Sequence, residues 1–389
     1  MMQRDDSGNN RESQAPTTRT TGYLWDAVFG WHDTGSGTMF PADPNAGHQP
    51  ISHHVAHPDT KRRMHELICV SGLADHLTSI APRTATEAEL TRVHTQEYVD
   101  RIKHESELPK GGDAGDGISP FGKGAYRIAA LGAGSAIAMT EAVVNGTVDN
   151  GYALVNPAGH HALPETGMGF CMFNNVAIAA KHAQAELGIE RIAIVDWDVH
   201  HGNGAQAIFG DDPSVLTISL HQDRCFPPNS GLVNERGVDA GHGYNINIPI
   251  PVGTGDGGYQ YAAETVIGPA LEAFAPELIL VASGFDANAM DPLSRQLVTT
   301  RSFITLTETV MAAADRSAGG RLVLLQEGGY SPVYVPFCGL ATIETLAGVH
   351  VMDDGILPVV GGMGGHDLEP HQKALVDKVA EYIGDIKRA

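Results

Sequence analysis

Short apolar runs rich in β-branched residues alternate with longer amphipathic stretches from residue 151 onward, and this pattern restricts the fold more than any other feature. Continuous apolar strands separated by helices are typical of a parallel sheet covered on both faces. The apolar runs are Tyr152–Asn156, Arg191–Asp196, Val215–His221, Tyr244–Pro249, Leu278–Ser283 and Arg321–Gln326. The helical stretches are Asp59–Ser71, Gly124–Val144, Asn174–Leu187, Gly258–Phe274, Arg301–Ala318 and Glu369–Lys387. The pattern predicts a single α/β domain.

The composition is that of an ordinary globular chain, with 389 residues and 42% hydrophobic residues. Acidic residues outnumber basic ones 46 to 25, and the formal charge of −21 disfavours direct binding to nucleic acid. The same charge could favour cationic substrates such as polyamines or lysine-rich peptides, although acidity also serves solubility. The four cysteines lack CxxC spacing and predict neither a disulfide framework nor a thiolate zinc site.

The N-terminal residues 1–20 are polar and lack the apolar centre of a secretory signal. We expect them to be a disordered lead-in to a catalytic domain over residues 21–389, in a cytoplasmic protein. We expect no membrane span, because no stretch reaches about eighteen uninterrupted apolar residues. The loop 32–54, rich in Gly, Pro and His, is a candidate channel rim or subunit contact.

The segments that follow the apolar runs contain nearly all the chemically capable clusters. They read NPAGHHA (156–162), DWDVHHGNG (196–204), SLHQDRCFPP (219–228), SGFDA (283–287) and QEGGY (326–330). In open parallel sheets, ligands bind outside the carboxyl ends of the strands. The sequence therefore predicts one site at one edge of the sheet.

The alternating residues Asp196, Asp198 and His200 come directly after an apolar run. If the backbone stays extended, side chains two residues apart project to the same side. Two carboxylates placed so closely need a compensating cation, and Asp286 adds an oxygen ligand from a later strand end. Such an Asp₂His set leaves an open position, as catalytic zinc requires, although Fe²⁺, Co²⁺ and Mn²⁺ also suit these ligands. The alternative is a capped loop whose aspartates bind backbone amides.

Candidate proton-transfer groups come from two other strand ends. His160 and His161 occupy a turn shaped by Pro157 and Gly159, and histidine suits proton transfer near neutral pH. Tyr330 can donate a phenol O–H to the oxyanion of a tetrahedral intermediate. The alternatives are a pair of surface histidines and a tyrosine packed at a helix start.

The motifs AGHHA, GFCMFNN, DWDVHHGNG, SLHQDRCFPP, SGFDA and QEGGYS, in this order and spacing, resemble the histone deacetylase family. HPDTKRR near the N-terminus agrees, and the resemblance covers nearly the whole chain from Thr21 onward. It is strongest to the bacterial class II histone deacetylase-like amidohydrolases, which are related to acetylpolyamine amidohydrolases. The resemblance implies the arginase/deacetylase fold, with a mostly parallel eight-stranded sheet and helices on both faces.

The resemblance also assigns roles to individual residues. It implies one zinc ion per chain on Asp198, His200 and Asp286. His161 would be the general base and acid, while His160, held by Asp196, would stay closer to cationic, and Tyr330 would polarise the acyl carbonyl. The other positions implied are Phe170, Phe226 and Gly169 along a narrow acyl-lysine channel, Asp116 as a rim carboxylate, and Asp196, Ser219 and Leu220 for a structural potassium ion.

Two positions vary within the family. Asn203 stands where class I members carry an aspartate behind the second histidine, so His161 should be less basic here. Tyr330 is present where some class II relatives carry a histidine and deacetylate acetyl-lysine poorly. The resemblance thus implies an active deacetylase.

The expected activity is zinc-dependent removal of acetyl or other short acyl groups from acylated amines, with an acetyl-lysine peptide or an acetylpolyamine as substrate. One alternative is a hydrolase of acetylpolyamines or other small amides at the same site. Another is a binuclear ureohydrolase, for which Asp291 is the only spare aspartate close by; a third is a silent acyl-lysine binder. The resemblance further implies a homo-oligomer, either a dimer or a tetramer.

Overall fold

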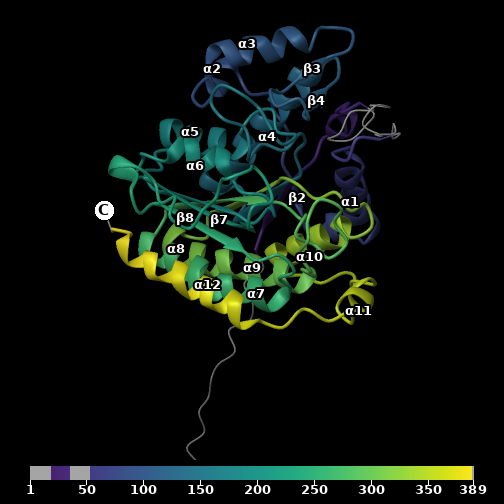
Figure 1. Ribbon diagram of the computed structural model, residues 1–389. Coiled ribbons are helices and arrows are strands. Elements are labelled where there is room, and N and C mark those ends of the chain that lie inside the picture. Colours follow the sequence, from purple (N-terminus) through teal and green to yellow (C-terminus); the bar gives the residue numbers. More distant parts are fainter. Residues whose placement is uncertain (1–18, 36–52, 388–389) are drawn as a thin grey trace, which may run out of the picture.

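The computed structural model describes residues 19–35 and 53–387, so residues 1–18 of the expected lead-in and residues 36–52 of the expected rim loop lie outside it (Figure 1). Its eight-stranded sheet has the order β2-β1-β5-β10-β9-β6-β7-β8, and every neighbouring pair is parallel. The strands are β1 (Thr21–Leu24), β2 (Thr78–Ser79), β5 (Asn150–Ala153), β6 (Ile192–Asp196), β7 (Val215–Gln222), β8 (Asn245–Ile250), β9 (Leu278–Ser283) and β10 (Leu322–Gln326). A short antiparallel ribbon pairs β3 (Gly112–Asp113) with β4 (Pro120–Phe121).

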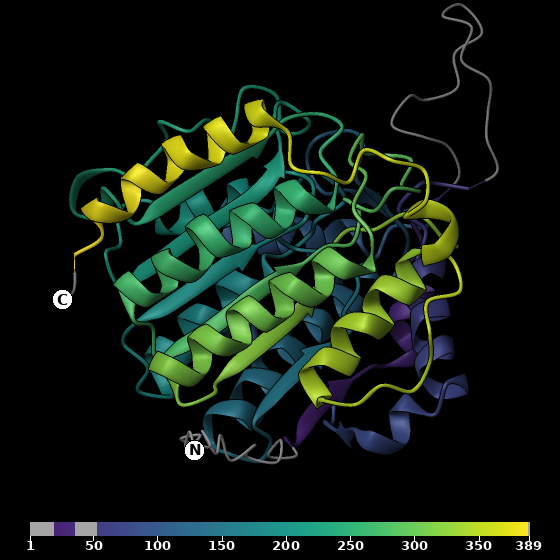
Figure 2. The same cartoon turned by 90° about the horizontal axis from the view of Figure 1, so that it is seen from below.

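Helices cover both faces of the sheet, as the apolar runs predict. One layer holds α4 (Ala125–Val144), α5 (Asn175–Glu186) and α6 (Asn203–Phe209), with α2 (Glu87–Leu90) and α3 (Gln96–Glu105) outside them. The other holds α7 (Asp256–Ala262), α8 (Gly268–Phe274), α9 (Thr300–Ala313), α10 (Val335–Ala347) and α12 (Pro370–Ala380), and Figure 2 shows these helices side by side. At the margin lie α1 (Asp59–Val70), which packs against α10, and α11 (Leu357–Val360).

Alternate strand residues face opposite helix layers. Ile194 of β6 belongs to the core cluster that contains α4 and α5, whereas the next residue, Val195, belongs to the cluster that contains α9 and α10. The same alternation holds for Leu280 and Val281 on β9. Because both sides of each central strand are buried, the strands are apolar throughout, and the predicted α/β class with a parallel sheet is confirmed.

Some predicted bounds are wrong. The strand expected over Tyr152–Asn156 ends at Ala153, because the chain then turns towards the loop that carries His160 and His161. The expected helix Glu369–Lys387 ends at Ala380 and tightens into a 3₁₀ segment that contains Gly384, a weak helix former. Helix α10 was not anticipated, since it is buried on most sides and lacks an amphipathic period.

The long apolar helix α4 meets the length and composition of a membrane span, but 72% of its apolar window is buried inside the fold. Burial of this kind is typical of the core helix of a globular domain. Close packing here depends on Gly134, where an added Cβ would lie 2.1 Å from the backbone oxygen of Arg83 and 2.3 Å from the nitrogen of Ala85.

Strand register brings the ends of several strands to the same level. Asp196, the last residue of β6, pairs with Ser219 of β7 and Ala282 of β9, and Gln326 of β10 pairs with Ser283 of β9. The loops that follow β6, β9 and β10 therefore start beside one another, and β7 continues to Gln222 at the same edge. This register places the predicted site loops at one edge.

Substitution of Gly134 by alanine should lower the free energy of unfolding by about 1–3 kcal/mol, because the new methyl group meets rigid backbone. Gly132, two residues earlier in the same helix, is the matched control, since its nearest neighbour would be 3.7 Å from the new Cβ. Gly132→Ala should leave stability unchanged or raise it by up to about 1 kcal/mol through helix propensity. Urea unfolding midpoints measure both changes; equal midpoints for the two variants would contradict this packing.

Candidate active site

Asp198, His200 and Asp286 form a compact trio at the carboxyl edge of the sheet, and one ligand atom from each lies within 4.8 Å of the others. His200 Nδ1 is 3.0 Å from Asp198 Oδ1 and 3.1 Å from Asp286 Oδ2. These separations are close to the ~3.3 Å edge of a tetrahedron with ligands about 2.0 Å from a metal. The donor atoms and their spacing therefore fit a small divalent cation such as zinc.

The expectation of an extended backbone from Asp196 to His200 is wrong. The strand ends at Asp196, and the chain bends over the next residues while the N–H of Asp198 donates to Asp196 Oδ1. As a result, Asp196 turns to the histidine pair and does not join the trio. Asp286, brought by β9, completes the ligand set in its place.

Backbone amides hold the two carboxylates of the trio in position. Asp198 accepts the N–H of His200 at 2.9 Å and the N–H of Gly328 at 2.8 Å, and Asp286 accepts the N–H of Val199 at 2.7 Å. Hydrogen bonds from backbone amides to the aspartates are what the alternative to a metal site, a capped loop, would show. Here they are present together with the cluster of possible metal ligands. They leave one oxygen of each carboxylate facing His200 Nδ1.

The electrostatics of the trio favour a bound cation. Asp198 and Asp286 are 0% exposed, so their charges have no solvent to stabilise them. Burial, and then the neighbouring Asp198 carboxylate, raises the pKa of Asp286 to about 6. A divalent cation would remove this conflict and keep both carboxylates ionised.

The two adjacent histidines have opposite environments. Burial lowers the pKa of His160, but the carboxylates of Asp198 and Asp196 outweigh it and raise the pKa to about 10, with Nδ1 2.9 Å from Asp196 Oδ2. Burial and the positive charges of His160 and His200 lower the pKa of His161 well below its usual value. The shifts favour the protonated form of His160 and the neutral form of His161, so the two members of the pair are biased in opposite directions.

His161 is oriented by Asn203 from helix α6. Its Nδ1–H donates to Asn203 Oδ1 at 2.7 Å, which leaves the Nε2 lone pair free. The Asn203 amide also donates to the backbone oxygen of His161 at 3.3 Å. This double contact fixes both the tautomer and the direction of the imidazole.

A narrow pocket of about 110 Å³ leads to His161, His200 and Tyr330. Its remaining lining is Ile118, Gly169, Phe170, Cys225, Phe226 and Leu293. The rings of Phe226 and His161 are 4.9 Å apart, and those of Phe170 and Tyr330 are 5.8 Å apart, so the two predicted wall residues stand at the pocket.

Glycine is required at position 169. Its φ is +56°, and an added Cβ would lie 2.3 Å from His161 and 2.8 Å from Phe226. A side chain at this position would therefore close the pocket. The predicted rim residue Asp116 supports the turn, because its Oδ2 accepts the N–H of Gly169 at 2.7 Å while Oδ1 accepts that of Ile118. A contact of Asp116 with substrate stays a prediction.

The residues expected to hold potassium also lie at this edge. Ser219 Oγ accepts the N–H of Gly202 at 3.2 Å, Asp196 is the partner of Ser219 across the strands, and Leu220 is fully buried. Their side-chain and backbone oxygens are suitable donors for a hard cation. Potassium binding stays a prediction.

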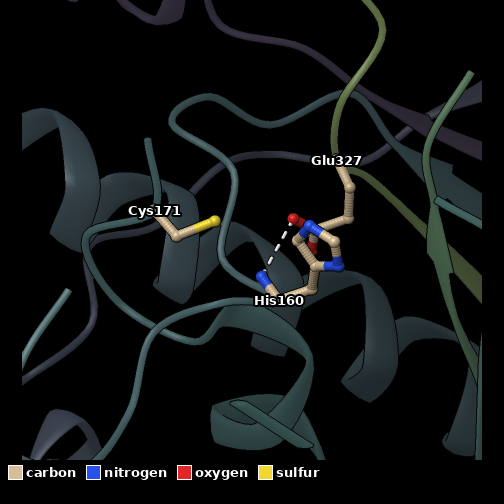
Figure 3. A group of neighbouring side chains, drawn as sticks. All are labelled: His160, Cys171 and Glu327. Carbon is tan, nitrogen blue, oxygen red and sulfur yellow. Dashed lines mark hydrogen bonds between the residues drawn. The ribbon is translucent and has the colours of Figure 1, made fainter. Parts of the chain in front are cut away.

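A second candidate metal cluster contains His160, Cys171 and Glu327 (Figure 3). Figure 3 shows the Glu327 carboxylate at the backbone N–H of His160, a bond of 3.1 Å, with the Cys171 sulfur pointing towards the pair. Burial raises the pKa of the Cys171 thiol well above its usual value, and His160 Nδ1 already contacts Asp196. Since a thiol must lose its proton to bind a metal, this cluster fits a cation poorly.

Glu327 and Lys61, two buried charged residues around the site, were not predicted from sequence, and Asp291 was named only as a spare aspartate for a second metal ion. Glu327 accepts the N–H groups of Gly159 and His160, and Asp291 accepts those of Tyr330 and Ser331, so each fixes a loop of the site. Lys61 of α1 is 3% exposed and lies beside Tyr330. One signal in the sequence could have indicated that Lys61 is buried. Lys61 lies on the apolar face of a predicted helix, at i, i+3 and i+7 spacing with Met64 and Ile68.

Comparison with known proteins agrees with this geometry. A model of the histone deacetylase domain matches residues 54–346. A histone deacetylase-like amidohydrolase of Pseudomonas aeruginosa is 47% identical over 333 residues, which cover 85% of this chain and 87% of that protein. A probable deacetylase of Archaeoglobus fulgidus is 38% identical over 276 residues, covering 71% and 76% of the two chains.

A solved structure gives the same result for the fold. The crystal structure of the HDA15 HD domain superposes with a TM-score of 0.78 at 31% identity, and the match covers 94% of this chain and 98% of that one. The shared fold, the extent of the sequence match and the gathered site residues lead to one assignment. The chain belongs to the histone deacetylase family of deacetylases and amidohydrolases.

Proposed function

We propose that this protein is a zinc-dependent amidohydrolase that removes acetyl or other short acyl groups from acylated amines. The observation that carries the proposal is the buried Asp198–His200–Asp286 trio at the end of a narrow apolar pocket. A zinc ion held by these three residues would polarise the acyl carbonyl and lower the pKa of the attacking water. Family membership supports hydrolysis of an amide bond.

The protein side chains divide the proton transfers and charge stabilisation. His161, neutral with a free Nε2, accepts the proton of the attacking water and then donates it to the leaving amine. His160, held cationic by Asp196, stabilises the negative charge that develops nearby. Tyr330 lines the pocket and donates its O–H to the carbonyl oxygen as that oxygen becomes an oxyanion.

The pocket supports an acyl-lysine side chain as substrate. Between Phe170 and Phe226 the described lining is mainly apolar and includes no carboxylate, so it suits a neutral alkyl chain. Acetyl-lysine peptides and acetylpolyamines both present such an alkyl chain next to the amide, so this lining suits either substrate class.

The described residues do not favour a binuclear ureohydrolase. Asp291, the spare aspartate that a second ion would need, accepts backbone N–H groups of Tyr330, Ser331 and Leu293. The only other cluster that the described residues offer is His160, Cys171 and Glu327, whose protonation is unfavourable for a metal. One ion per chain in the active site is the expectation.

Substitution of Asp198 by alanine should abolish zinc binding at the trio and reduce deacetylation of an acetyl-lysine peptide to background, because one of three protein ligands is lost. Elemental analysis and a reporter assay on the same sample measure the two effects. Asp353→Ala, which removes an exposed surface carboxylate, is the matched control and should retain both zinc and activity. A fully active, zinc-free Asp198→Ala protein would contradict the proposal.

Substitution of Asn203 by aspartate should shift the acid limb of the kcat/KM pH profile to higher pH. The base must be neutral to accept a proton, so activity is lost as pH falls through the pKa of His161. A carboxylate beside Nδ1 carries a full negative charge, so it stabilises the imidazolium more than the hydrogen bond to the amide oxygen does and raises this pKa further. Measurement from pH 5 to 9 checks the shift. An unchanged limb, or one moved to lower pH, would exclude His161 as the base.

A further inference from the structure

A lysine is buried on the apolar face of helix α1. Its neighbours at helical spacing on this face are Met64 and Ile68, both fully buried, and Lys61 itself is 3% exposed. The adjacent Arg62 is exposed and pairs with Asp59. Burying a lysine is unfavourable unless charged or polar groups stabilise the ammonium, so the position calls for an explanation.

The ammonium group of Lys61 lies at the face of the Tyr330 ring, with Nζ 5.5 Å from the ring centroid. This distance is within the range of a cation–π interaction, which is stronger when the cation is desolvated. Burial lowers the pKa of Lys61, and the carboxylates of Asp286, Asp198, Glu327 and Asp291 oppose this decrease.

The loop that carries Tyr330 has separate supports for its backbone and its side chain. Asp291 Oδ2 accepts the N–H of Tyr330 at 2.7 Å and that of Ser331 at 3.2 Å, which fixes the backbone. The phenol ring packs nearly perpendicular to the ring of Phe170, and the ammonium group of Lys61 lies over its face. Tyr330 follows two glycines, so the backbone before it imposes little on the direction of the ring.

We propose that Lys61 is a positioning residue for Tyr330: its buried ammonium group, docked on the ring face, holds the phenol hydroxyl towards the reacting carbonyl. This inference rests on the proposed function, in which Tyr330 is the oxyanion donor. Lys61 acts through Tyr330 and does not line the substrate pocket. A misplaced oxyanion donor costs turnover more than substrate affinity, because the bond strengthens only as charge develops.

The test uses the zinc-loaded, full-length protein and an acetyl-lysine peptide. Lys61→Met keeps an unbranched side chain that is one atom shorter and removes the charge. We expect kcat to fall by about 5- to 30-fold, with KM changed less than about 3-fold and zinc content unchanged. Arg62→Met, on the next residue of the same helix, should keep kcat within about 2-fold, since Arg62 is exposed.

A double-substitution cycle separates a role through Tyr330 from a merely structural one. Tyr330→Phe should lower kcat by about 100- to 1,000-fold with zinc retained, because the oxyanion donor is gone. In this background, Lys61→Met should lower kcat by less than about 2-fold more, since no hydroxyl remains to be positioned. Lys61→Arg, which keeps the charge, should recover at least part of the lost kcat.

The outcomes distinguish the two proposals. A wild-type protein without deacetylase activity, or a Tyr330→Phe variant of near-normal rate, would overturn the proposed function. An impaired Tyr330→Phe variant together with a normal Lys61→Met variant would overturn only the role of Lys61, and so would an equal Lys61→Met loss in both backgrounds. If Lys61→Met does not fold, as judged by thermal unfolding, Lys61→Gln gives the same comparison with a neutral polar head group.

Discussion

Electrostatic repulsion between two buried aspartates determines much of the organisation of this protein. Asp198 and Asp286 lie in loops that follow two different strands, are inaccessible to solvent and share one imidazole, His200. Such an arrangement is unfavourable without a positive charge at its centre, so a bound cation would stabilise the fold. The surrounding structure supports the trio, since backbone amides from two loops bind the outward-facing carboxylate oxygens.

Around this trio, the other buried charged side chains contact groups of opposite charge, backbone N–H groups or an aromatic ring. The carboxylates of Asp198 and Asp196 raise the pKa of His160, whereas burial and the positive charges of His160 and His200 lower the pKa of His161, so the two adjacent histidines have opposite environments. Glu327 links the histidine turn to the loop of Tyr330, and Asp291 anchors the backbone of that loop. Burial of Lys61 against the Tyr330 ring is part of the same charge balance. The active site is therefore a network in which carboxylates, amides and cations fix one another's direction.

The sequence predicted the parallel sheet and the site edge well because both depend on local patterns. Strands buried on two faces must be apolar throughout, and the carboxyl ends of parallel strands must meet, so the runs and the segments after them were sufficient. The short strands β1 and β2 and the uniformly apolar helix α10 have no such pattern and were missed. The bend after Asp196 was also missed, because an alternating Asp-x-Asp-x-His pattern looks the same in an extended chain and in a turn.

Contacts between distant residues are beyond the reach of a single sequence, and this explains why the contacts of Glu327, Asp291 and Lys61 were not predicted. Their partners are set by the three-dimensional arrangement, such as the 168-residue separation between Gly159 and Glu327. The central claim, that one divalent cation at the trio is needed for hydrolysis, is tested most directly by titrating metal-free wild-type protein with zinc while deacetylation is measured. We expect activity to rise linearly and to reach its plateau at one zinc ion per chain. Full activity before any metal is added, or a plateau only at two ions per chain, would contradict it.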